Sequence, residues 1–105
     1  MSSPARLLIT GTVVQLQSCE LYAGHYSAVI EAHHICPKSW WVAAHKPVDT
    51  PMAELCGLCH NNVHAAIDGL IRKLDVSRLP PRAVRMARRA LDIAAVSGLA
   101  PALTL

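Results

Sequence analysis

The sequence predicts a small α+β domain, with strands in its first third and two helices in its second half. Segments rich in β-branched residues come first, and apolar residues recur at helical spacing later in the chain. Proline-rich connections separate these regions. With 105 residues, the chain has room for one domain with a modest core. We therefore treat residues 1–105 as a single domain.

The strand prediction covers two segments. From Leu7 to Gln17 the chain is rich in Leu, Ile, Val and Thr, which favours extended structure with a break near Gly11. The stretch from Cys19 to Gly24 is typical of a turn. Tyr26 to His34 then predicts a second strand, which Pro37 ends because proline cannot continue a ladder.

Residues 37–51 carry three prolines and two tryptophans without a clear period, so they predict a loop lying over the fold. A helix follows from about His60 to Leu74. Its apolar positions share one face: Val63, Ile67, Leu70, Ile71 and Leu74. A last helix is predicted at about residues 81–97, started by Pro80-Pro81 and stopped by Gly98 and Pro101. Its expected buried stripe is Val84, Ala87, Leu91 and Ala94 or Ala95.

Composition limits the class of protein. The chain has no phenylalanine and four other aromatic residues, so the core must be aliphatic and thin, and a structural metal would help it. A net charge of +3 gives a mild bias toward phosphates. We see no secretory signal and no apolar run long enough to span a membrane. The four cysteines are therefore expected to be reduced thiols that bind metal in a cytosolic protein.

Side chains that can bind a metal gather in two short clusters. The first is the pair His33-His34, and the second is the segment Cys56-Gly-Leu-Cys59-His60-Asn-Asn-Val-His64. Cys56 and Cys59 have the spacing of a zinc knuckle. His60 and His64 lie one helical turn apart and can share a metal. Adjacent strand residues point to opposite faces, so one of the first pair can bind a metal while the other activates water.

These two segments together resemble the HNH endonucleases, or ββα-metal (His-Me finger) nucleases. Glu31-Ala-His33-His34-Ile35-Cys-Pro37 is similar to the family's HHI-x-P signature, and Leu55 to His64 is similar to its LC-x-x-CH-x-x-VH signature. The motif core spans about residues 19–74, and small HNH proteins of this type are encoded by phages and prophages. The resemblance implies a β-hairpin packed on a helix, with the C-terminal helix added.

The resemblance also implies roles. His33, His60 and His64 would ligate one divalent ion (Mg²⁺, Mn²⁺, Ni²⁺ or Zn²⁺), and His34 would be the general base. A neutral imidazole suits that task near pH 7. The predicted reaction is hydrolysis of DNA phosphodiester bonds.

Two positions depart from the family pattern. In the zinc-stabilised branch a Cys-x-x-Cys precedes the first strand, but here Tyr22 replaces its second cysteine. A structural zinc would therefore have Cys19, Cys56 and Cys59, with His25 or Cys36 as fourth ligand. The family's middle asparagine, which holds the loop carrying the base, falls on Pro51. Asp49 or Asn61 could substitute for it.

DNA contacts are expected from basic side chains outside the motif. Arg72 and Lys73 would close the motif helix, and Lys38 follows the histidine pair. The last helix carries arginines opposite its apolar stripe: Arg82, Arg85, Arg88 and Arg89. Such a face could follow phosphates or could be an ordinary solvated surface.

The leading hypothesis is thus a metal-dependent DNA endonuclease in the cytoplasm of a bacterial host, encoded by a phage or prophage. One alternative is a non-catalytic, zinc-stabilised nucleic-acid-binding module, which the missing asparagine favours. The other is a phage packaging accessory protein that contacts terminase subunits. No membrane association is expected.

Overall fold

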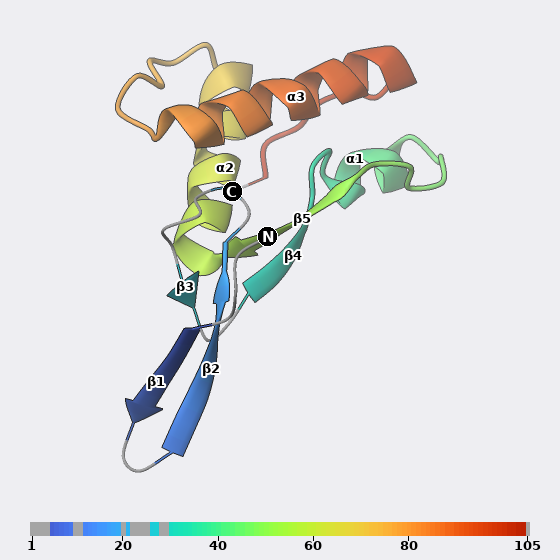
Figure 1. Cartoon of the computed structure of the whole chain (residues 1–105). Coiled ribbons are helices and arrows are strands. Elements are labelled where there is room, and N and C mark those ends of the chain that lie inside the picture. Colours follow the sequence, from blue (N-terminus) through green and yellow to red (C-terminus); the bar gives the residue numbers. More distant parts are fainter. Residues whose placement is uncertain (1–4, 10–11, 20, 22–25, 28–29, 105) are drawn as a thin grey trace.

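A computed structural model describes residues 5–9, 12–19, 21, 26–27 and 30–104 of the chain (Figure 1). Its elements are β1 (Ala5–Ile9), β2 (Thr12–Ser18), β3 (Tyr26–Ser27), β4 (Ile30–His34), α1 (Lys38–Ala43), β5 (Met52–Cys56), α2 (Gly57–Ile71) and α3 (Pro81–Ser97). The prediction of a mixed α+β fold is confirmed. None of the helices in these described ranges is both long and apolar enough to cross a membrane.

The strands form two separate antiparallel sheets. β1, β2 and β3 pair in that order, and the β1–β2 hairpin extends away from the rest of the molecule (Figure 1). β4 pairs with β5. The predicted second strand, 26–34, is therefore divided between two sheets, with residues 28–29 outside the described ranges. Most of the predicted turn, 19–24, also lies outside them.

The prediction of a loop over residues 37–51 is wrong for its first part. α1 begins directly after Pro37 and turns both tryptophans inward, where Trp40 is 1% exposed and Trp41 4%. A helix this short shows too few residues for a period to be recognised. β5 was also not predicted, although Met52 and Glu54 are exposed while Ala53 and Leu55 are buried, as in a half-buried strand.

α2 follows β5 without a connecting loop and begins at Gly57, three residues before the predicted start. It ends at Ile71, so Arg72 is its C-cap and Lys73, with a φ of 59°, lies beyond it. The prediction that Leu74 belongs to the buried face is wrong, because this residue is 60% exposed. Val63, Ala66 and Ile67 form that face.

The predicted bounds of the last helix are confirmed, and Gly98 ends it in the left-handed conformation with a φ of 69°. Ala87 and Ala94 are buried as predicted, but Ala83 and Ala90 are buried in place of the predicted Val84 and Leu91. The fully buried positions are all alanines: Ala83, Ala87, Ala90 and Ala94. Val84 and Leu91 are half-buried and Ala95 is exposed. Alanine side chains are small, so these positions allow α3 to pack closely against α2.

α2 lies at the centre of the molecule, packed against α3 and against both strands of the β4–β5 pair. The chain after α3 turns back toward these elements (Figure 1). Its path is fixed by Leu99, which is 7% exposed, and by a hydrogen bond of 3.0 Å from Trp40 Nε1 to the Ala102 carbonyl oxygen. The last described residues therefore lie beside α2 and β4.

Candidate metal centres

Three imidazoles converge where β4 meets α2. His33, in β4, faces the small Ala53 across the hairpin, while His60 and His64 stand one turn apart on α2. The ring centroid of His33 lies 4.9 Å from that of His60 and 5.2 Å from that of His64. One ring nitrogen from each residue lies within 4.8 Å of the other two. The structure thus brings together the three histidines predicted as ligands.

Hydrogen bonds on the outer side of the cluster determine where the ring protons lie. Glu31 Oε2 is 3.0 Å from His60 Nδ1, and an ionised carboxylate can only accept, so this nitrogen carries a proton. The Thr104 hydroxyl lies 3.1 Å from His64 Nδ1 and donates its own proton to Asp68 Oδ1 at 3.0 Å. It therefore accepts from His64 Nδ1. In the neutral form of each of these two rings, the proton is therefore on Nδ1.

The inner nitrogens of His60 and His64 are consequently both acceptors. His60 Nε2 and His64 Nε2 face each other at 2.9 Å, with a lone pair on each. His33 Nε2 is buried and has no hydrogen-bond partner among the described residues. Lone pairs this close repel each other unless a cation lies between them. Imidazole nitrogens are common ligands of divalent metals, so the donor set fits a metal ion.

Burial favours the neutral form of His33 and of His64. His33 is 3% exposed, and burial, followed by the nearby rings of His60 and His64, lowers its pKa from 6.5 to about 4. Burial and His60 also lower the pKa of His64, against a smaller opposing effect of Asp68 and Glu31. A metal ligand must be unprotonated, and at neutral pH His33 already is.

An open hollow of about 350 Å³ adjoins the cluster. Its lining includes all three clustered histidines and, beside them, His34, Lys38 and Thr104. His34 is half-buried and is not part of the group of three, which agrees with the expectation that only one of the adjacent histidines can reach a shared ion. The predicted base and the predicted ligands thus border one cavity.

The segment that follows His34 is held by Thr50, for which the sequence carried no signal, and by Pro51, the residue at the expected position of the middle asparagine. The Ile35 amide donates to the Pro51 carbonyl oxygen at 3.0 Å, and the Cys36 amide donates to Thr50 Oγ1 at 3.0 Å. Asp49 and Asn61, the suggested substitutes for the middle asparagine, are both exposed. Thr50 and Pro51 therefore fix the backbone next to the predicted base.

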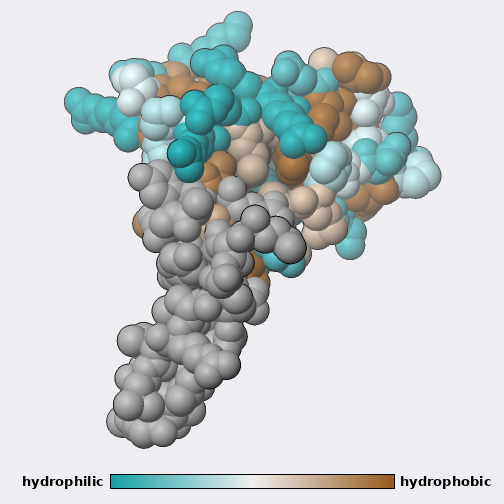
Figure 2. Space-filling model, in the orientation of Figure 1, coloured by the Kyte–Doolittle hydropathy of each residue, from teal (hydrophilic) through white to brown (hydrophobic). Residues whose placement is uncertain are grey.

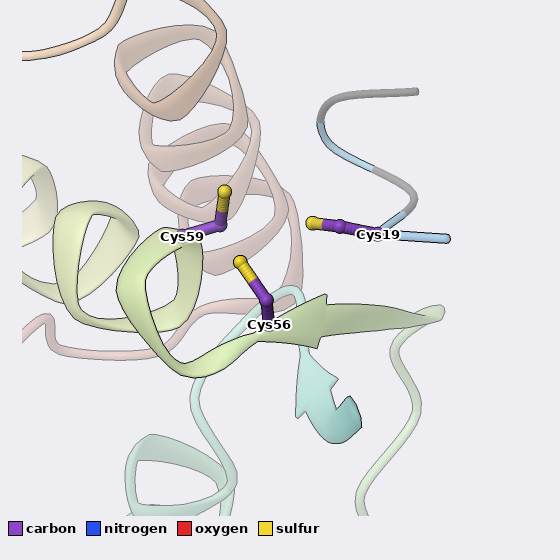
Figure 3. A group of neighbouring side chains, drawn as sticks. All are labelled: Cys19, Cys56 and Cys59. Carbon is purple, nitrogen blue, oxygen red and sulfur yellow. The ribbon is translucent and has the colours of Figure 1, made fainter. Parts of the chain in front are cut away.

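A second cluster consists of thiols. Cys19 follows β2, Cys56 ends β5 and Cys59 lies in the first turn of α2, and their sulfur atoms point toward one another (Figure 3). The three Sγ atoms lie within 4.8 Å of each other, and none of the cysteines forms a disulfide. Burial, then hydrogen bonds to the other two thiols, raise the pKa of Cys59 to about 12. A bound cation would reverse this effect, because metal-bound thiols deprotonate.

The fourth ligand of this cluster is not identified. His25, one candidate, lies outside the described residues. Cys36, the other, is fully buried but does not belong to the group whose sulfur atoms lie within 4.8 Å of one another. Three sulfur ligands still define a site suited to Zn²⁺.

The basic residues predicted to contact DNA are exposed, and hydrophilic side chains gather over α3 (Figure 2). Arg82, Arg85 and Arg89 line one shallow hollow with Leu21 and Met86. This hollow shares no residue with the one beside the histidines, where Lys38 lies. Arg88 borders a further hollow, and Arg72 and Lys73 lie past the end of α2.

Comparison of the chain with protein-family models, with curated proteins and with solved structures finds no match. The described residues form an α+β fold with one cluster of three histidines and one of three cysteines, each arranged so that it could hold a metal ion.

Proposed function

We propose that this chain is a metal-dependent endonuclease of the HNH type, which hydrolyses DNA phosphodiester bonds. β4, β5 and α2 would form its ββα-metal core. The observation that carries the proposal is the convergence of three imidazoles beside an open hollow that His34 also lines. Each part of this arrangement has a task in phosphodiester hydrolysis.

His33, His60 and His64 would hold the divalent ion. When bound, such an ion neutralises negative charge on the phosphate and on the leaving oxygen. His34, as a neutral imidazole, would take a proton from the water that attacks phosphorus while the bond from phosphorus to the leaving oxygen breaks. Lys38, exposed at the edge of the same hollow, would attract the phosphate backbone.

The division of roles follows from exposure. His33 is 3% exposed and has a pKa of about 4, so it is too buried to meet a water and too weak a base near neutral pH. His34 is half-buried and borders the hollow. The amides of the next two residues, Ile35 and Cys36, donate hydrogen bonds to Pro51 and Thr50 and so secure its position, as the middle asparagine does in the family.

The cysteine cluster would hold a structural Zn²⁺. It joins the chain after β2 to the junction of β5 and α2, positions 37 residues apart between Cys19 and Cys56. Binding free energy at such a site contributes directly to folding, which suits a small domain with a thin core. The zinc would thus stabilise the start of the helix that carries His60 and His64.

Plasmid nicking tests the catalytic proposal. With Mg²⁺ or Mn²⁺ present, the wild type should cut supercoiled DNA, and His34→Ala should lose at least about 99% of this activity while keeping its fold. His45→Asn is the matched control. His45 is exposed and has a φ of 55°, which asparagine tolerates, so this variant should cut like the wild type.

A chelator should stop cleavage, and added Mg²⁺ should restore it. Full activity of His34→Ala would reject the assigned base. DNA binding by the wild type without cleavage under any of the four metals would instead favour the non-catalytic module. Co-purification with terminase subunits, again without cleavage, would favour the packaging role.

A further inference from the structure

The segment after α3 reaches the histidine cluster. Trp40 Nε1 donates a hydrogen bond to the carbonyl oxygen of Ala102. Leu103 and Thr104, which follow Ala102, line the hollow beside the histidines. This part of the chain lies 40 residues from His64 in sequence and carries no motif. It nevertheless forms one wall of the candidate site.

Thr104 is held there by Asp68, a buried carboxylate one turn beyond His64 on α2. Asp68 is 7% exposed. Its Oδ1 accepts the Thr104 amide proton at 2.8 Å and the Thr104 hydroxyl proton at 3.0 Å. The Thr104 hydroxyl oxygen also lies within hydrogen-bond distance of His64 Nδ1, at 3.1 Å. Asp68, Thr104 and His64 thus form one chain of hydrogen bonds that ends in the cluster.

The donor-to-acceptor direction of these hydrogen bonds decides which nitrogen of His64 is available to bind a metal. A hydroxyl has a single proton, and here the carboxylate receives it. The oxygen can then only accept from His64, which places the imidazole proton on Nδ1 and leaves the Nε2 lone pair facing His60 and His33. If the hydroxyl donated to His64 instead, the proton would lie on Nε2 and block that position.

We propose that Thr104 and Asp68 are positioning residues that set the tautomer and ring orientation of His64 for metal binding. The inference rests on the proposed function, because it assumes that the histidine cluster binds a divalent ion. Outer hydrogen bonds of this kind orient metal-ligating histidines and raise their affinity for the metal. Here the controlling group comes from a distant segment of the chain.

Nitrogen-15 NMR tests the tautomer directly. The full chain is loaded with one equivalent of Zn²⁺, which three thiolates bind in preference to imidazoles, and its histidine rings are observed near pH 8. The wild type and Thr104→Ser, which keeps the hydroxyl, should show His64 protonated on Nδ1. Thr104→Val, of similar shape but without the hydroxyl, should lose this preference.

Asp68→Ala provides a second variant, which removes the acceptor. The Thr104 hydroxyl can then donate its proton to His64 Nδ1, so the His64 proton should move toward Nε2. An unchanged tautomer in both Thr104→Val and Asp68→Ala would overturn the proposal. A shift in either one, with Thr104→Ser unaffected, would support it.

Calorimetry with Mn²⁺ gives the second measurement. Thr104→Val should bind about tenfold to a hundredfold more weakly than the wild type, while Thr104→Ser should restore most of the affinity. Equal affinity of wild type and Thr104→Val would count against a positioning role. If the wild type binds no second ion at all, the proposed function fails, yet the tautomer measurement still decides whether Thr104 and Asp68 orient His64.

Discussion

Replacing His33 should make the fold less sensitive to acid. The pKa of His33 is about 4 in the folded chain, against 6.5 without burial. Between these values the unfolded chain binds more protons, so stability rises with pH. The contribution is fully present above about pH 6.5 and is lost as the pH falls toward 4. The difference corresponds to about 3 kcal/mol, of which about 2.5 kcal/mol is lost between about pH 8 and pH 4.5.

The assay is urea unfolding of the wild type and of His33→Gln at about pH 8 and about pH 4.5, both loaded with one equivalent of Zn²⁺. Protonation of carboxylates and thiols also lowers the free energy of unfolding in acid, but these groups are common to both proteins. The difference between the two pH dependences of this free energy therefore isolates His33. The wild type should lose about 2–3 kcal/mol more than the variant. His45→Asn should follow the wild type.

Equal losses in the wild type and His33→Gln would refute the reasoning. They would mean that His33 is hydrated or paired when the chain is folded, and that its ring is not held neutral for a metal. A larger loss in the variant would contradict the sign of the pKa shift itself.

Three further predictions concern the surroundings of the two clusters. Cys59→Ser should lower the zinc content of the purified protein by about one ion per chain, whereas Cys36→Ala should keep its zinc; elemental analysis measures both. If Cys59→Ser retained as much zinc as Cys36→Ala, Cys59 would not be a zinc ligand. Gly57→Ala should weaken Mn²⁺ binding severalfold. A Cβ at this position would lie 3.0 Å from Glu31 Oε1 and would displace the carboxylate that orients His60. Unchanged Mn²⁺ affinity would exclude this role of Glu31. Arg85→Ala should weaken DNA binding equally for all DNA sequences and should lower the slope of log affinity against log salt concentration by about one. An unchanged slope would identify the α3 face as an ordinary solvated surface.

Much of the helical half could be predicted, because helix periodicity and caps are local signals. The bounds of α3 follow from Pro81 and Gly98. Its buried face follows only in part: Ala87 and Ala94 were predicted, whereas the burial of Ala83 and Ala90 depends on how α3 packs against α2. α1 and β5 were not predicted because six and five residues carry too little periodicity among prolines.

The candidate site was predictable only in its inner layer. His60 and His64 form a pair by helical spacing alone, and His33 joined them through resemblance to a family signature. Glu31, Thr50 and Thr104 act through hydrogen bonds to residues far away in sequence, and a lone polar residue in a strand or connection gives no signal of that kind. Asp68 offered one local hint, a carboxylate one turn after His64 on the same side of α2.

Anomalous X-ray diffraction from crystals grown with excess Zn²⁺ tests the central claim most directly, because it locates each ion without relying on activity. We predict one peak bounded by Cys19, Cys56 and Cys59, and a second at about 2.0–2.1 Å from a ring nitrogen of each of His33, His60 and His64. Occupancy of the cysteine cluster with no peak between the three imidazoles would contradict the account.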